Sequence, residues 1–502
     1  APSSPSEPAT HRARTSEVLS VQHLSVDSWS TEGLDIEALV AEYIKKKMAK
    51  ELPHSNNPPE VQRLVDEGKR TEWRTMLSKP DNVKLHFGRK AQQIREQYSH
   101  RFIGSRFVLT RKPLEEGAVI DPQNPATYTV KGRWCLQGHL DPDLHLKAQE
   151  GKLKSPTLSQ LGRMTLMQVL SSKNWSLQLG DIRGAFLEAG PLESRFRPLF
   201  AHQPPGGIPG LPEDAVIEIC GNIYGQNDAP ASWHRTFDES LKALQWKPSC
   251  FDPCLYQLRD EHNSLVGLLG IHVDDCALGG HGPVFEASVA KLKERFPFRK
   301  WRVRHGEFCG AMYSQQDDGS IRMSMKTSVD KIKPATIPKG KSTEALLEAH
   351  QVKVLRAING SLNWVTSQAR PDLAAQTSFS QQSFPNPKIK HLRNVNTIVR
   401  RAKQHADLDI TFKPIPLQDL AVCCHSDAAF ANVGNHTQAG FMIAFTHKSL
   451  NQGEMSAWNP AAWRSYRLTR AVSSTLAAES QAMATASGTV EWMCLLLHEI
   501  GR

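Results

Sequence analysis

Two adjacent acids stand between two apolar segments in the middle of the chain. Asp274 and Asp275 follow the run Leu265–Ile271 and precede Cys276–Gly280. A short turn between apolar runs predicts a β-hairpin with a buried face. Neighbouring carboxylates are unfavourable unless they are solvated, share a proton or hold a cation. A lone Asp-Asp pair is more typical of a solvated turn, so a metal-binding hairpin requires a third acid from elsewhere in the chain.

That third acid ends a second predicted strand. Trp175, Leu177, Leu179 and Asp181 alternate with other residues and therefore share one face of a strand. An acid on the apolar side of a strand requires a partner. Asp181 is accordingly the candidate third carboxylate, and Phe186, which follows it closely, is by default a core aromatic residue.

Lysines and arginines gather in three predicted elements. Lys131 and Arg133 lie two residues apart in a predicted strand and project from one face, which suits either phosphates or plain solvation. Cations interleave with apolar residues at Arg299, Lys300, Arg302 and Arg304, a mixture that suits a nucleic-acid backbone and equally a solvated edge strand. A later helix packs by an apolar face and leaves further cations outside, free for phosphates: Lys388, Lys390, Arg393, Arg400, Arg401 and Lys403.

The composition limits the class of protein. With 502 residues, 39% of them hydrophobic, the chain is long enough for two to four domains. It lacks the run of about 18–20 apolar residues that spans a membrane. Nine cysteines, an odd number scattered over the chain, argue for reduced thiols in an intracellular protein, cytoplasmic or nuclear. The net charge of +10 permits a nucleic acid as partner without requiring one.

Residues 1–58 are predicted to form a leader. They contain many Ser, Thr and Pro residues, which predicts disorder, interrupted by one basic helix at Ile36–Leu52 and followed by the linker Pro53–Pro59. The chain begins at Ala1 without Met, so we expect a fragment or a processed piece of a longer protein.

From about Glu72 to the C-terminus, the chain resembles the reverse transcriptase–RNase H region of copia-type retrotransposon Pol polyproteins. The resemblance rests on many motifs in one order. Val130–Gly138 is similar to the fingers segment KARLVAKG, Ser155–Thr157 to SPV, Leu179–Leu187 to LDVKNAFL, Tyr224–Trp233 to YGLKQAPRAW, His272–Asp275 to YVDD, Phe308–Gly310 to FLG, Arg370–Asp372 to RPD, Ser426–Phe430 to SDADWAG and Ser474–Glu479 to SSTEAE.

The resemblance implies an α+β fold with the palm, fingers and thumb of a reverse transcriptase, followed by a truncated RNase H-like α/β domain. Fingers and palm would occupy residues 59–325, a helical thumb or connection region 326–415, and the RNase H-like domain 416–502, incomplete at its C-terminus. The integrase and protease of such polyproteins would lie upstream of Ala1.

The same resemblance assigns roles to residues. Asp181, Asp274 and Asp275 would be catalytic and would hold Mg²⁺, with Mn²⁺ as a substitute, because two cations serve the displacement at phosphorus. The nucleotide would be bound by Lys131, Arg133, Phe186, Gly225 and Pro230, and the primer-template by His272, Arg299, Lys300, Arg302 and Arg304. Asp427 and Glu479 would be metal-binding acids of the RNase H-like domain.

The implied function is RNA-directed and DNA-directed DNA synthesis, in which a nucleotide passes from a dNTP to a primer 3′-OH. The partners would be an RNA template, a DNA primer or product, dNTPs and other segments of the Pol polyprotein, but no membrane. His272 replaces the family's Tyr, and Asn227 and Asp228 replace Lys-Gln. The next RNase H acid would lie beyond Arg502, so RNase H activity is expected to be lost. The alternative is a degenerate or repurposed copy that binds nucleic acid without catalysis.

Overall fold

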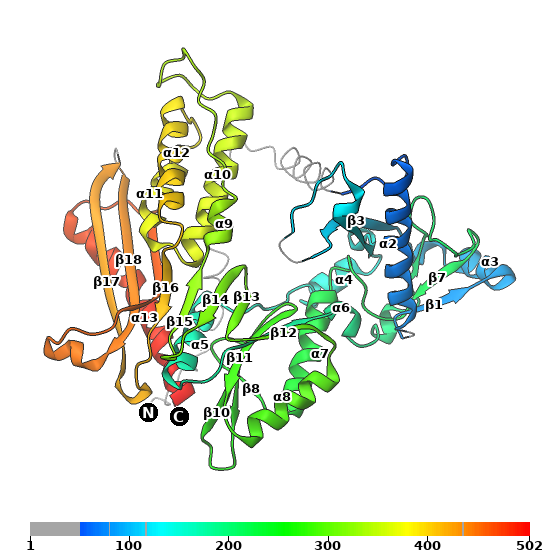
Figure 1. Cartoon of the computed structure of the whole chain (residues 1–502), viewed down its shortest axis with the longest axis horizontal. Helices are drawn as coiled ribbons and strands as arrows, with labels where there is room; N and C mark the ends of the chain where they lie inside the picture. Colours follow the sequence, from blue (N-terminus) through cyan, green and yellow to red (C-terminus); the bar gives the residue numbers. More distant parts are fainter. Residues whose placement is uncertain (1–50, 80, 116–117, 434–435, 502) are drawn as a thin grey trace, which may run out of the picture. The chain divides into compact units, whose positions relative to one another are not determined.

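A computed structural model describes residues 51–79, 81–115, 118–433 and 436–501 (Figure 1). Contacts group the described residues into two compact units, the first made of residues 51–78, 105–135 and 203–213 and the second of the remainder. These units do not coincide with the domain boundaries predicted at 58, 325 and 415, which stay a prediction. Most of the predicted basic helix falls outside the described residues.

The first unit packs one helix against a two-stranded sheet. Helix α2 (Pro59–Leu77) lies beside strands β3 (Ser105–Pro113) and β4 (Tyr128–Leu136). Trp73 of α2 meets Trp134 of β4 edge-on, with ring centroids 5.3 Å apart. Leu52 lies within the predicted leader, yet its side chain is buried and completes this small core. Its backbone N–H donates to the carbonyl of Leu109 at 2.9 Å.

The second unit is built on a six-stranded sheet in which every pairing is antiparallel. Its order is β12-β5-β11-β10-β9-β8. The strands are β12 (Phe298–Val303), β5 (Gln178–Ile182), β11 (Asp275–Gly280), β10 (Leu265–His272), β9 (Leu255–Arg259) and β8 (Lys247–Pro248). The predicted hairpin is confirmed as β10–β11, and the predicted strand that ends in Asp181 is confirmed as β5.

Helices cover both faces of this sheet. Gly279 of the hairpin lies against Leu170 of α5 (Gln160–Ser172), whereas Gly280, on the opposite face, lies against Phe285 of α8 (Pro283–Arg295). Helix α7 (Ala229–Ala243) adds Trp233, whose ring meets Phe296 at 5.3 Å. Both faces of the hairpin are therefore held by packing, which fixes the place of its tip.

A smaller sheet in the same unit has the order β1-β7-β6-β2, with one parallel pairing, between β2 and β6. Its strands are β1 (Val83–His86), β7 (Val216–Ile219), β6 (Phe200–Ala201) and β2 (Phe102–Ile103). Helix α3 (Gly88–Gln97) packs on it through Ala91 and Ile94. Two short helices, α4 (Leu144–Gln149) and α6 (Ala185–Glu188), complete this part of the chain.

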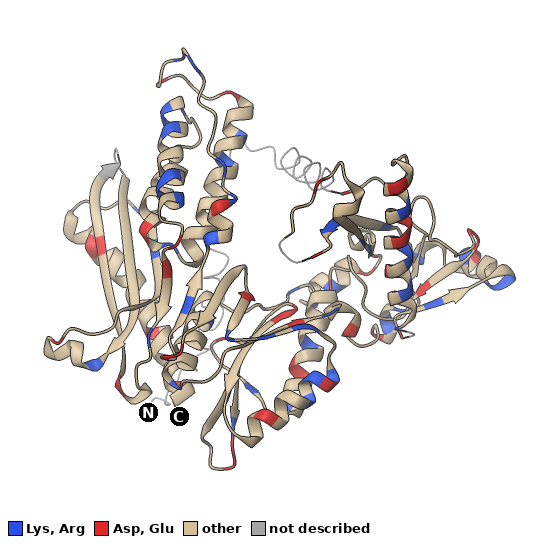
Figure 2. Cartoon of the chain, viewed as in Figure 1, with Lys and Arg blue, Asp and Glu red and all other residues tan. Residues whose placement is uncertain are grey.

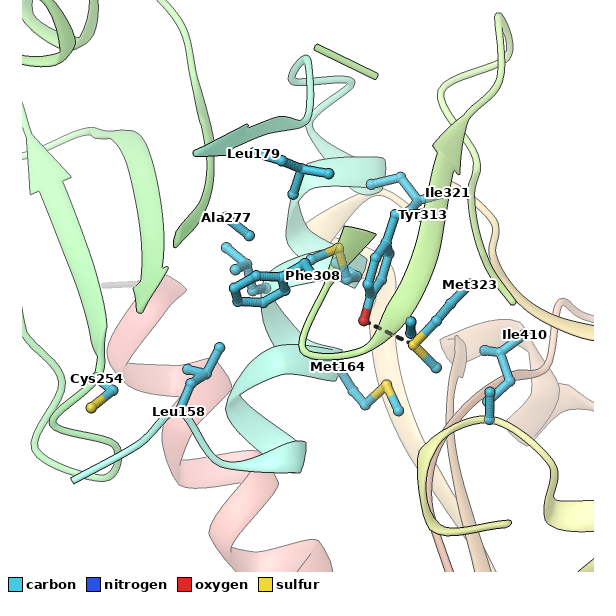
Figure 3. Packing of buried hydrophobic residues seen from close by; sticks show 14 of the residues in the cluster. Leu158, Met164, Leu179, Cys254, Ala277, Phe308, Tyr313, Ile321, Met323 and Ile410 are labelled. Atoms are coloured by element: carbon cyan, nitrogen blue, oxygen red, sulfur yellow. Dashed lines mark hydrogen bonds between the residues drawn. The ribbon is translucent and has the colours of Figure 1, made fainter. Parts of the chain in front are cut away.

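A third sheet supports the six-stranded one. It has the order β13-β14-β15-β16 and consists of β13 (His305–Phe308), β14 (Ala311–Gln315), β15 (Ile321–Ser324) and β16 (Asp409–Phe412). Figure 3 shows Phe308 and Tyr313 from this sheet in the cluster that also contains Leu179 and Ala277 of the six-stranded sheet. The tip of the hairpin is thus supported by a continuous apolar core.

Helices form most of the region that follows. They are α9 (Lys326–Asp330), α10 (Ala349–Gln368), α11 (Ala374–Gln381) and α12 (Ile389–Gln404). Trp364 of α10 lies against Gly310, just after β13. None of the described helices is long and apolar enough to cross a membrane.

The C-terminal region is a three-stranded antiparallel sheet with one long helix. Strands β17 (Leu420–Val433), β18 (His436–His447) and β19 (Asn459–Arg467) lie in this order, and helix α13 (Thr475–Gly501) packs on β17 and β18. Residues of this region, including Phe445 and Met493, belong to the same buried cluster as the six-stranded sheet. The predicted RNase H-like segment therefore shares its core with the rest of the second unit. As predicted, the chain has an α+β fold.

Candidate active site

The site is built by the register of two neighbouring strands. In the pairing of β5 with β11, Asp181 lies directly opposite Asp275. The register of the hairpin places His272 opposite Asp275 and leaves a two-residue turn, Val273 and Asp274. The three predicted acids therefore meet at one end of the six-stranded sheet, although the sequence separates Asp181 from the other two by a long segment.

The turn itself is strained and held by hydrogen bonds. Val273 has a φ of 60°, a backbone conformation that a β-branched residue rarely adopts. Its carbonyl accepts a hydrogen bond of 2.6 Å from Nε1 of Trp233. The carbonyl of Asp274 accepts one of 2.9 Å from the N–H of Ile182, next to Asp181. The two carbonyls tie the turn to helix α7 on one side and to strand β5 on the other.

The acids differ in exposure and in charge environment. Asp274 is exposed, whereas Asp275 and Asp181 are half-buried. Burial, followed by the negative charges of Asp274 and Asp181, raises the pKa of Asp275 to about 7, because each of these effects disfavours a second carboxylate charge. A cation would offset the repulsion within such a group of acids.

The side chain of one arginine, Arg299, lies next to one of the three acids. The register between β12 and β5 shifts between Phe298 and Lys300, so Arg299 is the extra residue of a β-bulge. Bulges redirect side chains, and here the guanidinium of Arg299 forms an ion pair with the Asp181 carboxylate. Within the part of the chain that the structure describes, no three His, Cys, Asp or Glu side chains converge as metal ligands.

The donor set nevertheless fits a divalent cation. Carboxylate oxygens are the hard ligands that Mg²⁺ prefers, and Mg²⁺ keeps several of its waters when bound. Two acids paired across neighbouring strands, with a third in the adjoining turn, supply this chemistry. Arg299 would have to release Asp181 before that carboxylate could contribute to a cation site.

His272, which replaces the family's Tyr, is half-buried beside the turn. Its Nδ1 is buried, and none of the described residues forms a hydrogen bond with it. Burial lowers the pKa of His272, and the positive charge of Arg163 lowers it further. Arg163, on α5, is itself buried. The imidazole therefore stays neutral at physiological pH and presents a planar, uncharged ring next to the acids.

Phe186 and Gly225 lie near one another beside the sheet. Phe186 is half-buried on α6, with its ring centroid 6.0 Å from that of Tyr224. Gly225 has a φ of 90°, and a Cβ there would lie 2.1 Å from the carbonyl oxygen of Leu136. Only glycine can adopt this backbone conformation and approach the carbonyl of Leu136 so closely. Gly225 therefore fixes the position of the segment that follows Tyr224 against Leu136.

Pro230 stands in the first turn of α7, where proline is favoured. The acid before this helix, Asp228, has a structural partner. Nζ of Lys147 lies 2.8 Å from Asp228 and 2.8 Å from Asp141, and all three side chains are buried. The substitution of the family's Lys-Gln thus places an acid in a closed charge cluster rather than at an open nucleotide surface. Asn227 donates to the carbonyl of Gly138 at 3.2 Å.

The predicted primer-template cations lie at or next to β12, an edge strand of the sheet. Arg304 forms an ion pair with Asp317 at 2.9 Å, Lys300 is exposed and Arg302 half-buried. In the first unit, the burial pattern of β4 places Lys131 and Arg133 on one side of the strand, as predicted. Burial raises the pKa of Glu72, and the positive charges of Lys131 and Arg133 nearby partly offset this rise.

The two predicted RNase H acids are not brought together. Asp427 and Ala429 of β17 line a cavity of about 310 Å³ with Pro371, Ala374 and Phe379. Ala428, between them, faces the other side of the sheet and packs with Ala478 of α13. Glu479 follows Ala478 on that helix, so the sheet separates it from Asp427. Neighbouring residues of a strand face opposite sides of the sheet. Because Ala428 faces α13, Asp427 faces away from it and cannot meet Glu479.

The sequence did not reveal the roles of three side chains. These are Lys147 beside Asp228, Arg163 near His272, and Arg299, which lies in a β-bulge and pairs with Asp181. Lys147 and Arg163 carry a usable signal, since each is a cation within a largely apolar or amphipathic segment. Their partners depend on pairings distant in sequence. The bulge at Arg299 has no such signal, because it is defined only by the register of β12 against β5.

Together, these features define a class. An antiparallel sheet with helices on both faces, and acids at the tip of its central hairpin next to the end of β5, is the palm of a reverse transcriptase-like polymerase. Residues 94–340 match the family described as reverse transcriptase (RNA-dependent DNA polymerase). This match, together with the similarity to the Pol polyproteins of plant transposons given below, confirms the predicted resemblance to copia-type reverse transcriptases and the reverse transcriptase part of the predicted fold class.

Curated relatives extend the match beyond this domain. The chain is 23% identical over 412 residues to the retrovirus-related Pol polyprotein from transposon RE1 of Arabidopsis thaliana, covering 76% of this chain and 27% of the relative. It is 22% identical over 414 residues to that of transposon RE2, with 76% and 27% covered. A putative transposon Ty5-1 protein of Saccharomyces cerevisiae is 21% identical over 301 residues, with 57% and 92% covered. The chain thus spans about a quarter of the first two relatives.

Among solved structures, the chain is similar to a foamy viral protease–reverse transcriptase in complex with double-stranded DNA. The TM-score is 0.43 and the identity 13%, with 91% of this chain and 73% of that chain covered. A foamy viral protease–reverse transcriptase in complex with an RNA/DNA hybrid gives a TM-score of 0.43 and 13% identity, with 90% of this chain and 56% of that chain covered. Both likenesses are too distant to support a conclusion about this chain.

Proposed function

We propose that this chain synthesises DNA on RNA and DNA templates by transfer of a nucleotide from a dNTP to a primer 3′-OH. The observation that carries the proposal is the register that sets Asp181 opposite Asp275, with Asp274 in the adjoining turn. Carboxylates grouped in this way are suited to cations that work on phosphate oxygens.

Asp181, Asp274 and Asp275 would hold Mg²⁺, or Mn²⁺ in its place. Bound there, the ions would make the primer 3′-oxygen a better nucleophile and stabilise the charge on the leaving pyrophosphate. The protein's own part is to fix the acids. The packing of both faces of the hairpin and the hydrogen bonds to the turn hold them where the strands end.

Other side chains would position the substrates. Lys131 and Arg133 would bind the triphosphate through their charge. Phe186 would lie at the 2′-position of the incoming sugar and exclude a ribose hydroxyl by its bulk, while Gly225 and Pro230 shape the surface beside it. His272 would contact the primer end as a neutral ring. Arg299 would pass from Asp181 to a phosphate when a cation arrives.

A primer-extension assay tests the proposal. The protein is given a primed RNA template, Mg²⁺ and dNTPs, beside the variant Asp274→Asn. We expect extension by the natural sequence and its loss in the variant, because the amide cannot supply the charge that a divalent cation needs. Primer-template binding without extension in either protein would contradict catalysis and leave a chain that only binds nucleic acid.

We further propose that the C-terminal region has no RNase H activity. The support is the position of Asp427 and Glu479 on opposite sides of the sheet, which prevents them from sharing a cation. An RNA/DNA hybrid labelled on its RNA strand should stay intact in the absence of dNTPs. Cleavage that is lost in Glu479→Gln would contradict this part of the proposal.

A further inference from the structure

The turn between β10 and β11 has a backbone conformation that its sequence does not favour. Val273 has a φ of 60°, in the left-handed region where a β-branched side chain is crowded by the backbone. Such a conformation persists only when the surrounding structure holds it. Glycine, which has no Cβ, would adopt it freely. Val273 must therefore be held by groups outside the turn.

The positions of the acids depend on this one residue. Val273 and Asp274 are the two residues of the turn, since the register pairs His272 with Asp275. A change of φ at Val273 would rotate the next peptide and move the Asp274 carboxylate away from that of Asp275. It would also break the hydrogen bond of 2.9 Å from the N–H of Ile182 to the carbonyl of Asp274, which joins the turn to β5.

The side chain of Trp233 is the group that holds the turn. Its Nε1 donates a hydrogen bond of 2.6 Å to the carbonyl of Val273. Trp233 is only 1% exposed, so its N–H is shielded from water. The indole has a single donor, and a buried donor left without a partner is costly. The indole therefore favours the one orientation of the Val273 carbonyl that keeps this hydrogen bond.

Trp233 is itself fixed by a cluster of aromatic rings. Its ring lies 5.4 Å from that of Phe237 and 5.3 Å from that of Phe296, and these two rings are 5.4 Å apart. Aromatic rings at such distances attract one another in addition to the gain from burial. The charged residues of α7, coloured in Figure 2, begin only at Arg235. The part of α7 that carries Trp233 is therefore held by packing, which joins it to the end of α8.

The start of α7 has two further attachments. The hydroxyl of Ser155 donates to the carbonyl of Pro230 at 3.1 Å. Asp228, the residue before the helix, lies 2.8 Å from Nζ of Lys147 in the buried charge cluster. The acid that departs from the family motif thus helps to fix the helix that carries Trp233.

We propose that Trp233 is a positioning residue of the acid site. Through the carbonyl of Val273, it keeps the turn in its left-handed conformation and so sets the affinity of Asp181, Asp274 and Asp275 for a divalent cation. Trp233 acts without touching the cation or a substrate. That the cation serves DNA synthesis rests on the proposed function, whereas the hold on the turn does not.

The test uses the full chain and does not require catalysis. Trp233→Phe removes the donor and keeps a ring, while Phe237→Leu is the matched control from the same cluster without a bond to the turn. Val273→Gly, alone and with Trp233→Phe, removes the strain. Hydrogen exchange of residues 268–278 is followed by mass spectrometry in the metal-free protein. Binding of Mn²⁺ is measured from the electron paramagnetic resonance of the free ion, with the binding that survives in Asp275→Asn subtracted.

We expect Trp233→Phe to speed exchange in the hairpin and to weaken Mn²⁺ binding by about ten- to a hundredfold, the range for a buried group that loses its hydrogen-bond partner. Phe237→Leu should change both quantities little. The double variant should bind Mn²⁺ within about twofold of Val273→Gly alone, because glycine adopts this φ without help from the indole.

Equal losses in Trp233→Phe and Phe237→Leu would overturn the proposal, since packing would then explain both. The same holds if Trp233→Phe weakens Mn²⁺ binding as much in Val273→Gly as in the natural chain. If Trp233→Phe does not fold, rescue of folding by Val273→Gly supports the proposal and failure of the double variant overturns it. A natural chain that binds Mn²⁺ as expected but never extends a primer would refute only the proposed polymerase activity.

Discussion

The tip of the hairpin and the C-terminal sheet show the same pattern in the sequence, acids within family motifs, but the structure arranges these acids differently. Each has acids in or next to a strand, and each matches a motif of the same polyprotein family. At the hairpin, the strand register sets Asp181 opposite Asp275. In the C-terminal sheet, Asp427 faces a cavity beside α11 while Glu479 lies on α13, across the sheet.

The difference teaches what makes a group of acids into a site. Across two paired strands, directly opposite residues point to the same face, so Asp181 meets Asp275. Burial, followed by the charges of Asp274 and Asp181, raises the pKa of Asp275. Along one strand, neighbours point to opposite faces, so a shift of one residue would turn Asp427 toward α13. Motif identity states which acids are present, whereas register and face decide whether they can share a cation.

The largest expected effect separates these two regions directly. Asp275→Asn should reduce primer extension by a factor of about a hundred to a thousand, as the removal of electrostatic stabilisation does elsewhere. Asp427→Asn should leave extension within about twofold, since its side chain lines a cavity to which Asp181, Asp274 and Asp275 do not contribute. Both variants are measured at saturating primer-template. Equal losses would show that the C-terminal sheet takes part in synthesis.

Features that depend on local sequence could be predicted, whereas features that depend on the register between distant strands could not. Apolar runs and alternation were enough to predict the hairpin and the strand that ends in Asp181, because these signals are local. Asp181 was singled out because it is an acid on the apolar face of a strand, and the motifs in order then implied that it shares a catalytic site with the hairpin acids. The bulge at Arg299 and the face of Asp427 could not be predicted, because each depends on a one-residue choice of register between distant segments.

The second prediction concerns Asp228, which has the fixed partner that Asp275 lacks. Lys147→Met would leave Asp228 and Asp141 buried without their cation. Breaking a buried pair on one side costs about 3–5 kcal/mol, so the free energy of unfolding should fall by that amount. Denaturant unfolding measures it. Lys388→Met, at an exposed pair, is the control and should cost less than about 1 kcal/mol. A small effect at Lys147 would mean that the cluster is open to water.

The third prediction tests whether the C-terminal region folds with the hairpin. Met493 of α13 is fully buried in the shared core, and its replacement by Ala should cost about 2–5 kcal/mol. The loss should appear in one cooperative transition of the whole second unit. Leu476→Ala, at a position 76% exposed on the same helix, should change little. Two separate transitions, with only one sensitive to Met493, would indicate an independent C-terminal domain.

The smallest expected effect is a gain in stability from the substitution that abolishes activity. Like charges directly opposite one another destabilise a sheet by a few tenths to about 1 kcal/mol. Asp275→Asn removes one such charge, so the metal-free variant should be more stable than the natural chain by about 1 kcal/mol at pH 8. Asp427→Asn, whose acid has no opposing acid in the register, should show no such gain.

The sign of the pH dependence follows from the raised pKa of Asp275, about 7. A carboxyl group whose pKa is higher when folded favours the folded state below its unfolded value, and this contribution is lost as the pH rises through about 4 to 7. The advantage of Asp275→Asn should therefore be small near pH 4 and grow toward pH 8, which thermal unfolding in the presence of a chelator measures. An advantage that stays constant with pH would mean that the gain comes from packing, and the contrast between the two groups of acids would then be one of shape and not of charge.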